Sequence, residues 1–338
     1  MKKTNFKNKS ILITGATGSF GKSFVKKLIT EKYPFRRIII FSRDELKQFE
    51  MKTNDIFNET KHKNLRYFIG DVRDKNRLLQ AFQDVDFVVH AAALKQVPTA
   101  EYNPFETINT NIIGAQNIIE SSLSTNVKKV IALSTDKASS PINLYGATKL
   151  CSDKLFTTAS NVSGFKDISF SVVRYGNVMG SRGSVIPHFF QQKKNGVLTI
   201  TDKEMTRFNI TLNESIDLVM WALENAYGSE IIVPKIPSYR IMDLAKSICN
   251  KCKIEITGVR PGEKINEEMI SLEESRNVIE LKKYYLVLQN GNIEQKKYYE
   301  KNFKGKFLKK QFSYSSDKNN KFLSQDELNK LIRKNFLV

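Results

Sequence analysis

Cysteine and histidine are scarce in this sequence, which argues against disulfide-rich and metal-binding classes of protein. Cys151, Cys249 and Cys252 are the three cysteines among 338 residues. So few cysteines make no disulfide framework, and they fit the reducing environment of the cytoplasm. Cys249 and Cys252 form a C-x-x-C, but no second C-x-x-C or histidine pair follows to complete a zinc site. We interpret the pair as a coincidence on a helix predicted over residues 243–252, with redox or metal use less favoured, and we expect no metal.

Long apolar runs are absent as well. No run reaches the ~18 apolar residues that a membrane-spanning helix needs. The apolar run after the basic residues 1–9 is too short for a secretory signal and ends in glycines. We therefore expect a cytoplasmic protein with no membrane partner. A hydrophobic content of 41% is ordinary for a globular protein, and the length suggests roughly two domains.

Acidic residues are outnumbered, with 35 Asp and Glu against 54 Lys and Arg, so the net charge is +19. A basic surface can attract nucleic acid or an anionic membrane. Here the lysines are spread along the chain rather than clustered with glycines and aromatic residues. We interpret them as a solvated surface that also favours anionic substrates, and we expect no nucleic-acid partner.

Glycine is concentrated where it can bind a phosphate. Residues 10–14 predict a short buried strand, and Gly15, Gly18 and Gly21 follow as G-x-x-G-x-x-G before a helical pattern. Gly15 permits a tight turn, Gly18 lets the backbone approach a pyrophosphate, and Gly21 lets the helix pack closely on the strand. The helix N-terminus offers N–H groups to the phosphates. The motif indicates a dinucleotide site.

Apolar runs alternate with helical patterns through the first half of the chain. Strands are predicted at residues 37–41, 65–69, 86–90, 130–133 and 168–174. This alternation is typical of an α/β protein with a doubly wound parallel sheet, the Rossmann type. We predict a dinucleotide-binding domain over residues 1–180 with a returning strand near 230–234. Residues 181–338 would form a smaller C-terminal substrate-binding lobe, with a loosely ordered basic tail from residue 301.

The residues after the second predicted strand bear on the choice of cofactor. Ser42 and Arg43 offer a hydroxyl and a guanidinium to a 2′-phosphate, and Lys47 lies one turn on, so we favour NADP. Asp44 could instead accept from a ribose hydroxyl, which leaves NAD open. The residues that we expect to hold the cofactor are Gly15, Thr17, Gly18, Ser19, Phe20, Gly21, Ser42, Arg43, Asp44, Lys47, Asp71, Val72, Ala92, Lys95, Tyr145 and Lys149.

Five chemically capable side chains follow the strand predicted at 130–133. Thr135, Asp136 and Lys137 leave its carboxyl end, where open α/β sheets bind ligands. A helix can begin near residue 143 or 144, which places Tyr145 and Lys149 at i and i+4 on one face. An ammonium beside a phenol lowers the phenol pKa, so Tyr145 can exchange a proton with a sugar hydroxyl.

These residues resemble the extended short-chain dehydrogenase/reductase superfamily. The glycine motif, Asp71-Val72, Ala91-Ala92-Ala93, Thr135 and Y-x-x-x-K at 145–149 fall in that family's order. The segments S-T-D-K-A at 134–138, R-Y-G-N-V at 174–178 and R-P-G-E-K at 260–264 resemble the UDP-N-acetylglucosamine 4,6-dehydratases more specifically. A tyrosine at position 145 resembles the inverting branch of that family, because the retaining branch carries Met at this position. Asn209 and Asn266 depart from the family's usual aromatic residue and histidine.

The resemblance implies an NADP-dependent enzyme that acts on a UDP-sugar, in the route to pseudaminic acid. It implies a triad of Thr135, Tyr145 and Lys149, with Asp136 as the acid and Lys137 as the base of the dehydration. It also implies a homo-oligomer, from dimer to hexamer. Guanidinium groups can bond phosphates bidentately, and Asn177 is a further phosphate candidate. The expected substrate-binding residues are Lys95, Asn177, Arg182, Val185, Thr199, Arg260 and Glu263, with Arg207 a weaker candidate.

Three other interpretations stay open. A nucleotide-sugar 4-epimerase needs Tyr145 and Lys149 but has no use for Asp136 beside Lys137. A retaining 4,6-dehydratase would differ only in the configuration at C5. A non-catalytic dinucleotide-binding protein would use its positive charge on nucleic acid or membrane, which the intact Tyr145–Lys149 pair argues against.

Overall fold

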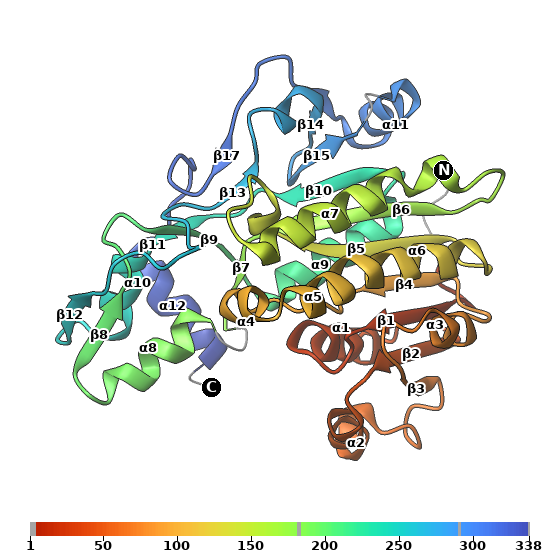
Figure 1. Ribbon diagram of the computed structural model, residues 1–338, viewed down its shortest axis with the longest axis horizontal. Coiled ribbons are helices and arrows are strands. Elements are labelled where there is room, and N and C mark those ends of the chain that lie inside the picture. The colour runs from red at the N-terminus through yellow and green to blue at the C-terminus, as the bar shows by residue number, and fades with distance from the viewer. Residues whose placement is uncertain (1–4, 181–183, 290–291, 337–338) are drawn as a thin grey trace.

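A broad twisted sheet between layers of helices, with a smaller lobe beside its carboxyl-terminal edge, makes up the fold (Figure 1). This computed structural model describes residues 5–180, 184–289 and 292–336. The predicted α/β class is confirmed.

Seven parallel strands form most of the sheet, and their order is that of a doubly wound fold. Every strand predicted in the first half is present, within one or two residues at each end. Residues such as Ile11, Leu12 and Ile13 are fully buried because helices cover both faces, so these strands are apolar along their length. In spatial order the strands are β3 (Leu65–Ile69), β2 (Arg37–Ser42), β1 (Ser10–Thr14), β4 (Phe87–His90), β5 (Lys129–Thr135), β6 (Ser169–Tyr175) and β10 (Glu230–Pro234).

Helices cover the two faces of this sheet. On one face α3 (Lys75–Ala81), α6 (Gly114–Leu123) and α7 (Leu144–Thr158) pack side by side, and α1 (Ser19–Thr30) packs with α9 (Leu212–Asn225) on the other. The chain enters α6 through α4 (Val97–Tyr102), α5 (Pro104–Ile108) and a π-helical turn (Asn109–Ile113). The remaining pieces are α2 (Glu45–Thr53) and 3₁₀ turns at Asp55–Phe57, Asp136–Ala138, Ala159–Val162 and Glu274–Asn277.

The second half of the chain extends the sheet. Beyond β10 lie the antiparallel strands β15 (Tyr284–Leu288), β14 (Val278–Glu280) and β16 (Lys306–Phe307), with α11 (Ile293–Phe303) beside them. The domain boundary near residue 180 stays a prediction, but residues well beyond it contribute to the central sheet.

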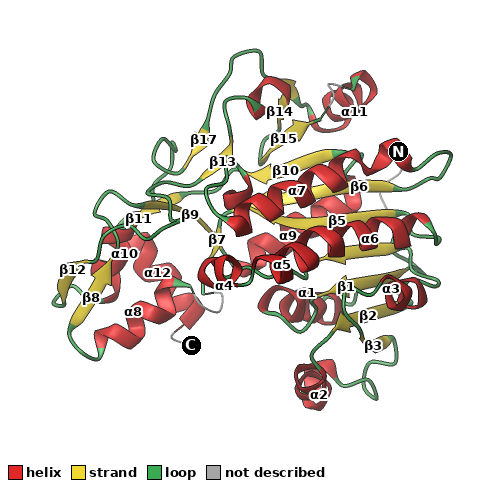
Figure 2. Ribbon diagram, viewed as in Figure 1, coloured by secondary structure: helices red, strands yellow, loops and turns green. Residues whose placement is uncertain are grey.

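The smaller lobe has its own apolar core, which contains Phe189, Leu198, Leu244 and Leu328. Figure 2 shows its helices packed around short strands. Its elements are β7 (Asn177–Val178), α8 (Val185–Lys193), β8 (Val197–Ile200), β9 (Thr206–Ile210), β11 (Ser238–Arg240), α10 (Ile241–Ile248), β12 (Lys253–Ile256) and α12 (Gln325–Phe336).

Two predictions about the second half are wrong. The tail after residue 301 is not loosely ordered, because β17 (Tyr314–Ser315) pairs with β13 (Glu268–Ile270) and α12 packs on α10. Cys249 and Cys252 are not a pair on a helix: α10 ends at Ile248, and the two sulfurs are bonded to each other in the turn that follows.

Candidate active site

The glycine turn between β1 and α1 forms one wall of a large cavity. Gly15 has a φ of +63°, and a Cβ there would lie 2.9 Å from the Cα of Ala92 at the end of β4. A Cβ on Gly21 would overlap the backbone of Ala16. Both positions therefore need glycine, for the turn and for the close packing of helix on strand, as we predicted.

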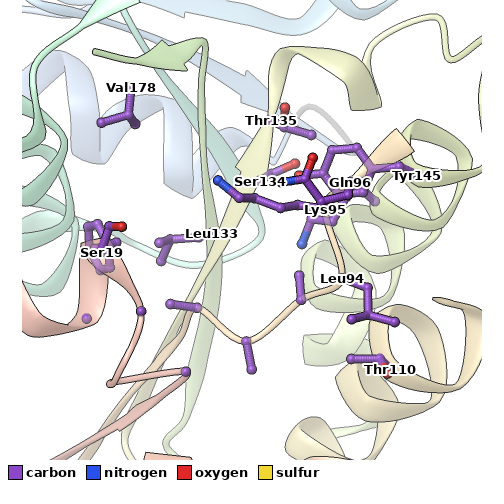
Figure 3. A pocket seen from close by; sticks show the side chains of 18 of the residues that line it. Ser19, Leu94, Lys95, Gln96, Thr110, Leu133, Ser134, Thr135, Tyr145 and Val178 are labelled. Carbon is purple, nitrogen blue, oxygen red and sulfur yellow. The ribbon is translucent and has the colours of Figure 1, made fainter. Parts of the chain in front are cut away.

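This first cavity has a volume of about 730 Å³ and follows the carboxyl ends of the parallel strands. Figure 3 shows Lys95, Thr135 and Tyr145 gathered on one side, Ser19 on the other and Leu133 between them. The structure thus brings together every residue predicted to bind the cofactor and all five predicted catalytic residues. The lining includes Gly15, Thr17, Gly18, Ser19, Phe20, Gly21, Ser42, Arg43, Asp44, Lys47, Asp71, Val72, Ala92, Lys95, Thr135, Asp136, Lys137, Tyr145 and Lys149.

The end of the first cavity away from Tyr145 is lined by polar side chains that pair with one another. The Thr17 and Ser42 hydroxyls lie 2.8 Å apart. The Arg43 guanidinium lies 3.5 Å from the Asp71 carboxylate, and its side chain is 54% exposed. Asp44 caps α2 and forms an ion pair with Lys47. Asp44 and Lys47 therefore partner each other, and Arg43 partners Asp71 at the rim of the cavity.

The helix α7 presents Tyr145 and Lys149 to the cavity. It begins where we predicted, because the Asn143 side chain accepts a hydrogen bond of 2.8 Å from the Gly146 N–H. Lys149 is 3% exposed, and burial lowers the pKa of its ammonium against the opposing charge of Asp153.

The expected lowering of the Tyr145 pKa is wrong for this structure. Burial raises the pKa of the Tyr145 phenol to about 12, and it outweighs the smaller lowering effects of the Lys137 charge and the Thr135 hydroxyl. The reason is desolvation, which disfavours the charged phenolate. Tyr145 is therefore a neutral phenol in this structure.

A buried charge cluster lies next to Tyr145. The Lys137 ammonium lies 3.0 Å from Asp136 Oδ1 and 2.9 Å from Glu267 Oε1. Asp136 and Glu267 are 1% and 2% exposed. Burial, reinforced by the charge of Glu267, raises the pKa of Asp136, although Lys137 opposes this. Burial acts to lower the pKa of Lys137, but the two carboxylates outweigh it and the net direction is upward.

Sequence reasoning missed Glu267. It lies 130 positions after Lys137 and belongs to no motif that we quoted. The segment that carries it is held by Arg207, whose guanidinium donates to the carbonyl oxygens of Lys264 and Ile265 at 2.9 and 2.8 Å. The guanidinium of Arg207, our weaker candidate for binding the substrate, is therefore hydrogen-bonded to the protein backbone.

A second cavity of about 600 Å³ opens beside the first, between the sheet and the smaller lobe. Lys137 and Asn177 line both cavities, so the two meet at the charge cluster. Arg260 and Glu263 form an ion pair of 3.4 Å in its wall. Of the predicted substrate residues, it is lined by Asn177, Val185, Thr199, Arg260, Glu263 and the weaker candidate Arg207; Lys95 lines the first cavity, and Arg182 lies outside the described residues.

Over residues 5–180, 184–289 and 292–336, no group of three or more His, Cys, Asp or Glu side chains is arranged to hold a metal ion. In the same part of the chain, no helix is both long and apolar enough to cross a membrane. The expectations of no metal, a cytoplasmic location and a homo-oligomer stay predictions.

Comparison with known proteins adds to this geometry. A family model described as "Polysaccharide biosynthesis protein" matches residues 11–289. A protein of Campylobacter jejuni subsp. jejuni serotype O:23/36, named UDP-N-acetylglucosamine 4,6-dehydratase (inverting), is 52% identical over 96% of this chain and 97% of its own. A Rickettsia bellii protein named UDP-glucose 4-epimerase is 44% identical over 87% of each chain. The X-ray structure of Pen from Bacillus thuringiensis superimposes with a TM-score of 0.87 at 38% identity, covering 99% of this chain and 100% of that one.

Proposed function

The chain belongs to the polysaccharide biosynthesis protein family, and we propose that it is a hydro-lyase that dehydrates UDP-N-acetylglucosamine across C5 and C6 with inversion at C5. The product would be UDP-2-acetamido-2,6-dideoxy-β-L-arabino-hexos-4-ulose, an intermediate of the kind used for pseudaminic acid. The observation that carries the proposal is the joint placing of Asp136 and Lys137 with Tyr145 and Lys149 in one cavity. Oxidation at C4 needs Tyr145 and Lys149, and the elimination needs Asp136 and Lys137.

The residues present fit a nicotinamide dinucleotide. Gly15 brings the turn onto Ala92, and the α1 N-terminus opens into the first cavity, which suits a pyrophosphate. Ser42 and Arg43 at the far end favour NADP over NAD. When bound, such a cofactor accepts hydride from C4 and returns it to C6, so no net oxidation results.

Tyr145 is the residue that would take the proton from the 4-hydroxyl. Thr135 is the last residue of β5 and lines the same cavity as Tyr145. The Thr135 hydroxyl can therefore hydrogen-bond the oxygen at C4 of the sugar. Lys149 lies on the same helical face as Tyr145. Because burial raises the pKa of Tyr145 to about 12, this step needs the positive charges near the phenol: that of Lys137, and that which an oxidised nicotinamide would add when bound.

Asp136 and Lys137 would carry out the elimination. Once C4 is a ketone, the C5 proton is α to a carbonyl and can be removed by a base. The elimination requires Lys137 as a neutral amine and Asp136, whose Oδ1 lies 3.0 Å from Lys137 Nζ, as a carboxylic acid. Lys137 then takes the C5 proton as Asp136 gives its proton to the departing 6-hydroxyl, which leaves as water. After hydride reaches C6, protonation of C5 from the opposite face completes the inversion.

A second candidate is a nucleotide-sugar 4-epimerase, which the 44% identity to the Rickettsia protein favours. That reaction uses Tyr145 and Lys149 and gives Asp136 and Lys137 no role. Epimerisation leaves the mass of the nucleotide sugar unchanged, whereas dehydration lowers it by one water. The mass of the product therefore distinguishes the two candidates.

Mass spectrometry of the nucleotide sugar tests the proposal. The purified chain is incubated with UDP-N-acetylglucosamine, and in parallel with UDP-glucose, with no cofactor added. We expect UDP-N-acetylglucosamine to lose the mass of one water. An unchanged mass, with conversion to a galacto isomer, would instead establish the epimerase.

A further inference from the structure

The position of Lys137 between two carboxylates is not explained by an acid–base pair alone. Asp136 is its neighbour in the sequence, but Glu267 is distant in the sequence and directly precedes β13. Asp136 lines the first cavity and Glu267 lines the second, while Lys137 lines both. The Lys137 ammonium is thus fixed at the junction of the two cavities by one contact from each side.

The cluster has more acceptors than donors. Asp136 Oδ2 and Glu267 Oε2 are both shielded from solvent and have no hydrogen-bond partner among the residues that the structure describes. Two buried carboxylates with unsatisfied oxygens so close together make a second negative charge costly, which favours a proton on one of them.

The surroundings decide which carboxylate keeps its charge. Arg207 Nε lies 3.8 Å from Glu267 Oε1, whereas Asp136 has Thr135, a hydroxyl donor, as its further partner at 3.0 Å. Burial acts to raise the pKa of Glu267, but the charges of Lys137 and Arg207 outweigh it and the net direction is downward. The pKa of Asp136 moves upward. Glu267 is therefore the member that stays ionised, and Asp136 is the member that accepts a proton.

We propose that Glu267 is a positioning residue for the elimination: it holds Lys137 Nζ at the junction of the cavities as its counter-ion and takes a proton from Nζ, which leaves Lys137 neutral to accept the C5 proton while Asp136 gives its own proton to the 6-hydroxyl. This inference rests on the proposed dehydration. Without the Glu267 charge, Asp136 is the sole carboxylate within hydrogen-bond distance of Lys137 among the described residues. Asp136 then stays an ionised partner and has no proton to give.

Each half of the reaction has its own readout, which separates this role from a structural one. Hydride transfer from C4 appears as the absorbance of reduced nicotinamide, and elimination appears as a C6 methyl group by NMR. For Glu267→Gln, with the substrate UDP-N-acetylglucosamine, we expect reduced nicotinamide to form and persist. Its kcat for dehydration should fall about 10²-fold with little change in KM, the size expected for loss of general acid catalysis.

The neighbouring Glu268 supplies a matched control. Its carboxylate accepts from Ser139, Ser140 and Ser313 and does not contact Lys137. Glu268→Gln keeps one acceptor oxygen, and its amide N–H can donate to a serine hydroxyl oxygen, so its dehydration rate should stay near that of the unmodified chain. Glu267→Asp keeps the charge on a shorter side chain and should recover part of the activity lost in Glu267→Gln.

Two outcomes overturn the inference. One is dehydration by Glu267→Gln at within about twofold of the unmodified rate. The other is loss of both hydride transfer and elimination in Glu267→Gln, which would mean a structural role. Failure of the unmodified chain to form a C6 methyl would instead contradict the proposed function, so the two claims fail in distinguishable ways.

Discussion

Replacing Gly176 with alanine tests how strongly the elimination depends on the spacing between β5 and β9. Gly176 lies between β6 and β7, and a Cβ there would lie 2.5 Å from the Cβ of Phe208 and 3.4 Å from Asp136 Oδ2. The Phe208 Cβ is fixed to its backbone, so a change of rotamer cannot relieve the overlap. The new methyl group would push β9, which carries Arg207, away from Asp136.

The size of the effect follows from these distances. Ordinary van der Waals contact begins near 3.4 Å, so the overlap requires a displacement of about 1 Å, and an error of that size in an active site costs about 10²-fold in rate. Overpacking of this kind costs roughly 1–3 kcal/mol of the free energy of unfolding. We therefore expect Gly176→Ala to fold with a lower melting temperature and to dehydrate UDP-N-acetylglucosamine about 10²-fold more slowly, measured by the C6 methyl signal.

Gly164 provides the control for loss of stability alone. Its φ is +60°, so alanine is strained there, but nothing lies within 4 Å of the Cβ position. Gly164→Ala should cost roughly 1–2 kcal/mol of stability and leave the reaction unchanged at temperatures where the protein is folded. Unchanged dehydration by a folded Gly176→Ala would refute the reasoning.

Three further predictions concern the cofactor, the oxidation and pH. Tyr145→Phe should lower hydride transfer and dehydration together by at least about 10²-fold, because both follow removal of the 4-hydroxyl proton; rapid-mixing absorbance checks this. Arg43→Ala should weaken NADP binding by about 10–10² while changing NAD binding little, which titration calorimetry would show. Burial lowers the pKa of His90 from 6.5 to about 3, so the stability contributed by neutral His90 is complete above the unfolded value and is lost as the pH falls below it. Between pH 6 and pH 5 the free energy of unfolding should fall by up to about 1.4 kcal/mol more in the unmodified chain than in His90→Gln.

Local pattern was sufficient for the parallel sheet and for the residues of the first cavity. Strands such as residues 10–14 are continuous apolar runs because both faces of the sheet are covered. In a doubly wound sheet the carboxyl ends of such strands meet at one edge. Thr135, Asp136 and the glycine turn therefore had to lie near one another once the alternation of strands and helices was recognised.

Features that depend on distant parts of the chain could not be predicted in this way. Glu267 meets Lys137 only because the segment after Arg260 folds back over the turn at Asp136–Ala138. The bond between Cys249 and Cys252 depends on where α10 ends, and helix ends are weakly marked in sequence.

The protonation state of Tyr145 was mispredicted for a related reason. The spacing of Tyr145 and Lys149 shows that the two share a helical face, but it says nothing about how far water is excluded from them. Burial dominates the pKa of Tyr145, and burial is a property of the assembled site.

An NMR time course in D₂O, with UDP-N-acetylglucosamine and no added cofactor, tests the central claim most directly. Inverting dehydration predicts a new C6 methyl group, deuterium at C5 and the coupling constants of an L-arabino ring. A C6 methyl group on a D-xylo ring would keep the dehydration and contradict the inversion. Formation of the galacto isomer with no C6 methyl group would contradict the assignment of Asp136 and Lys137 to an elimination.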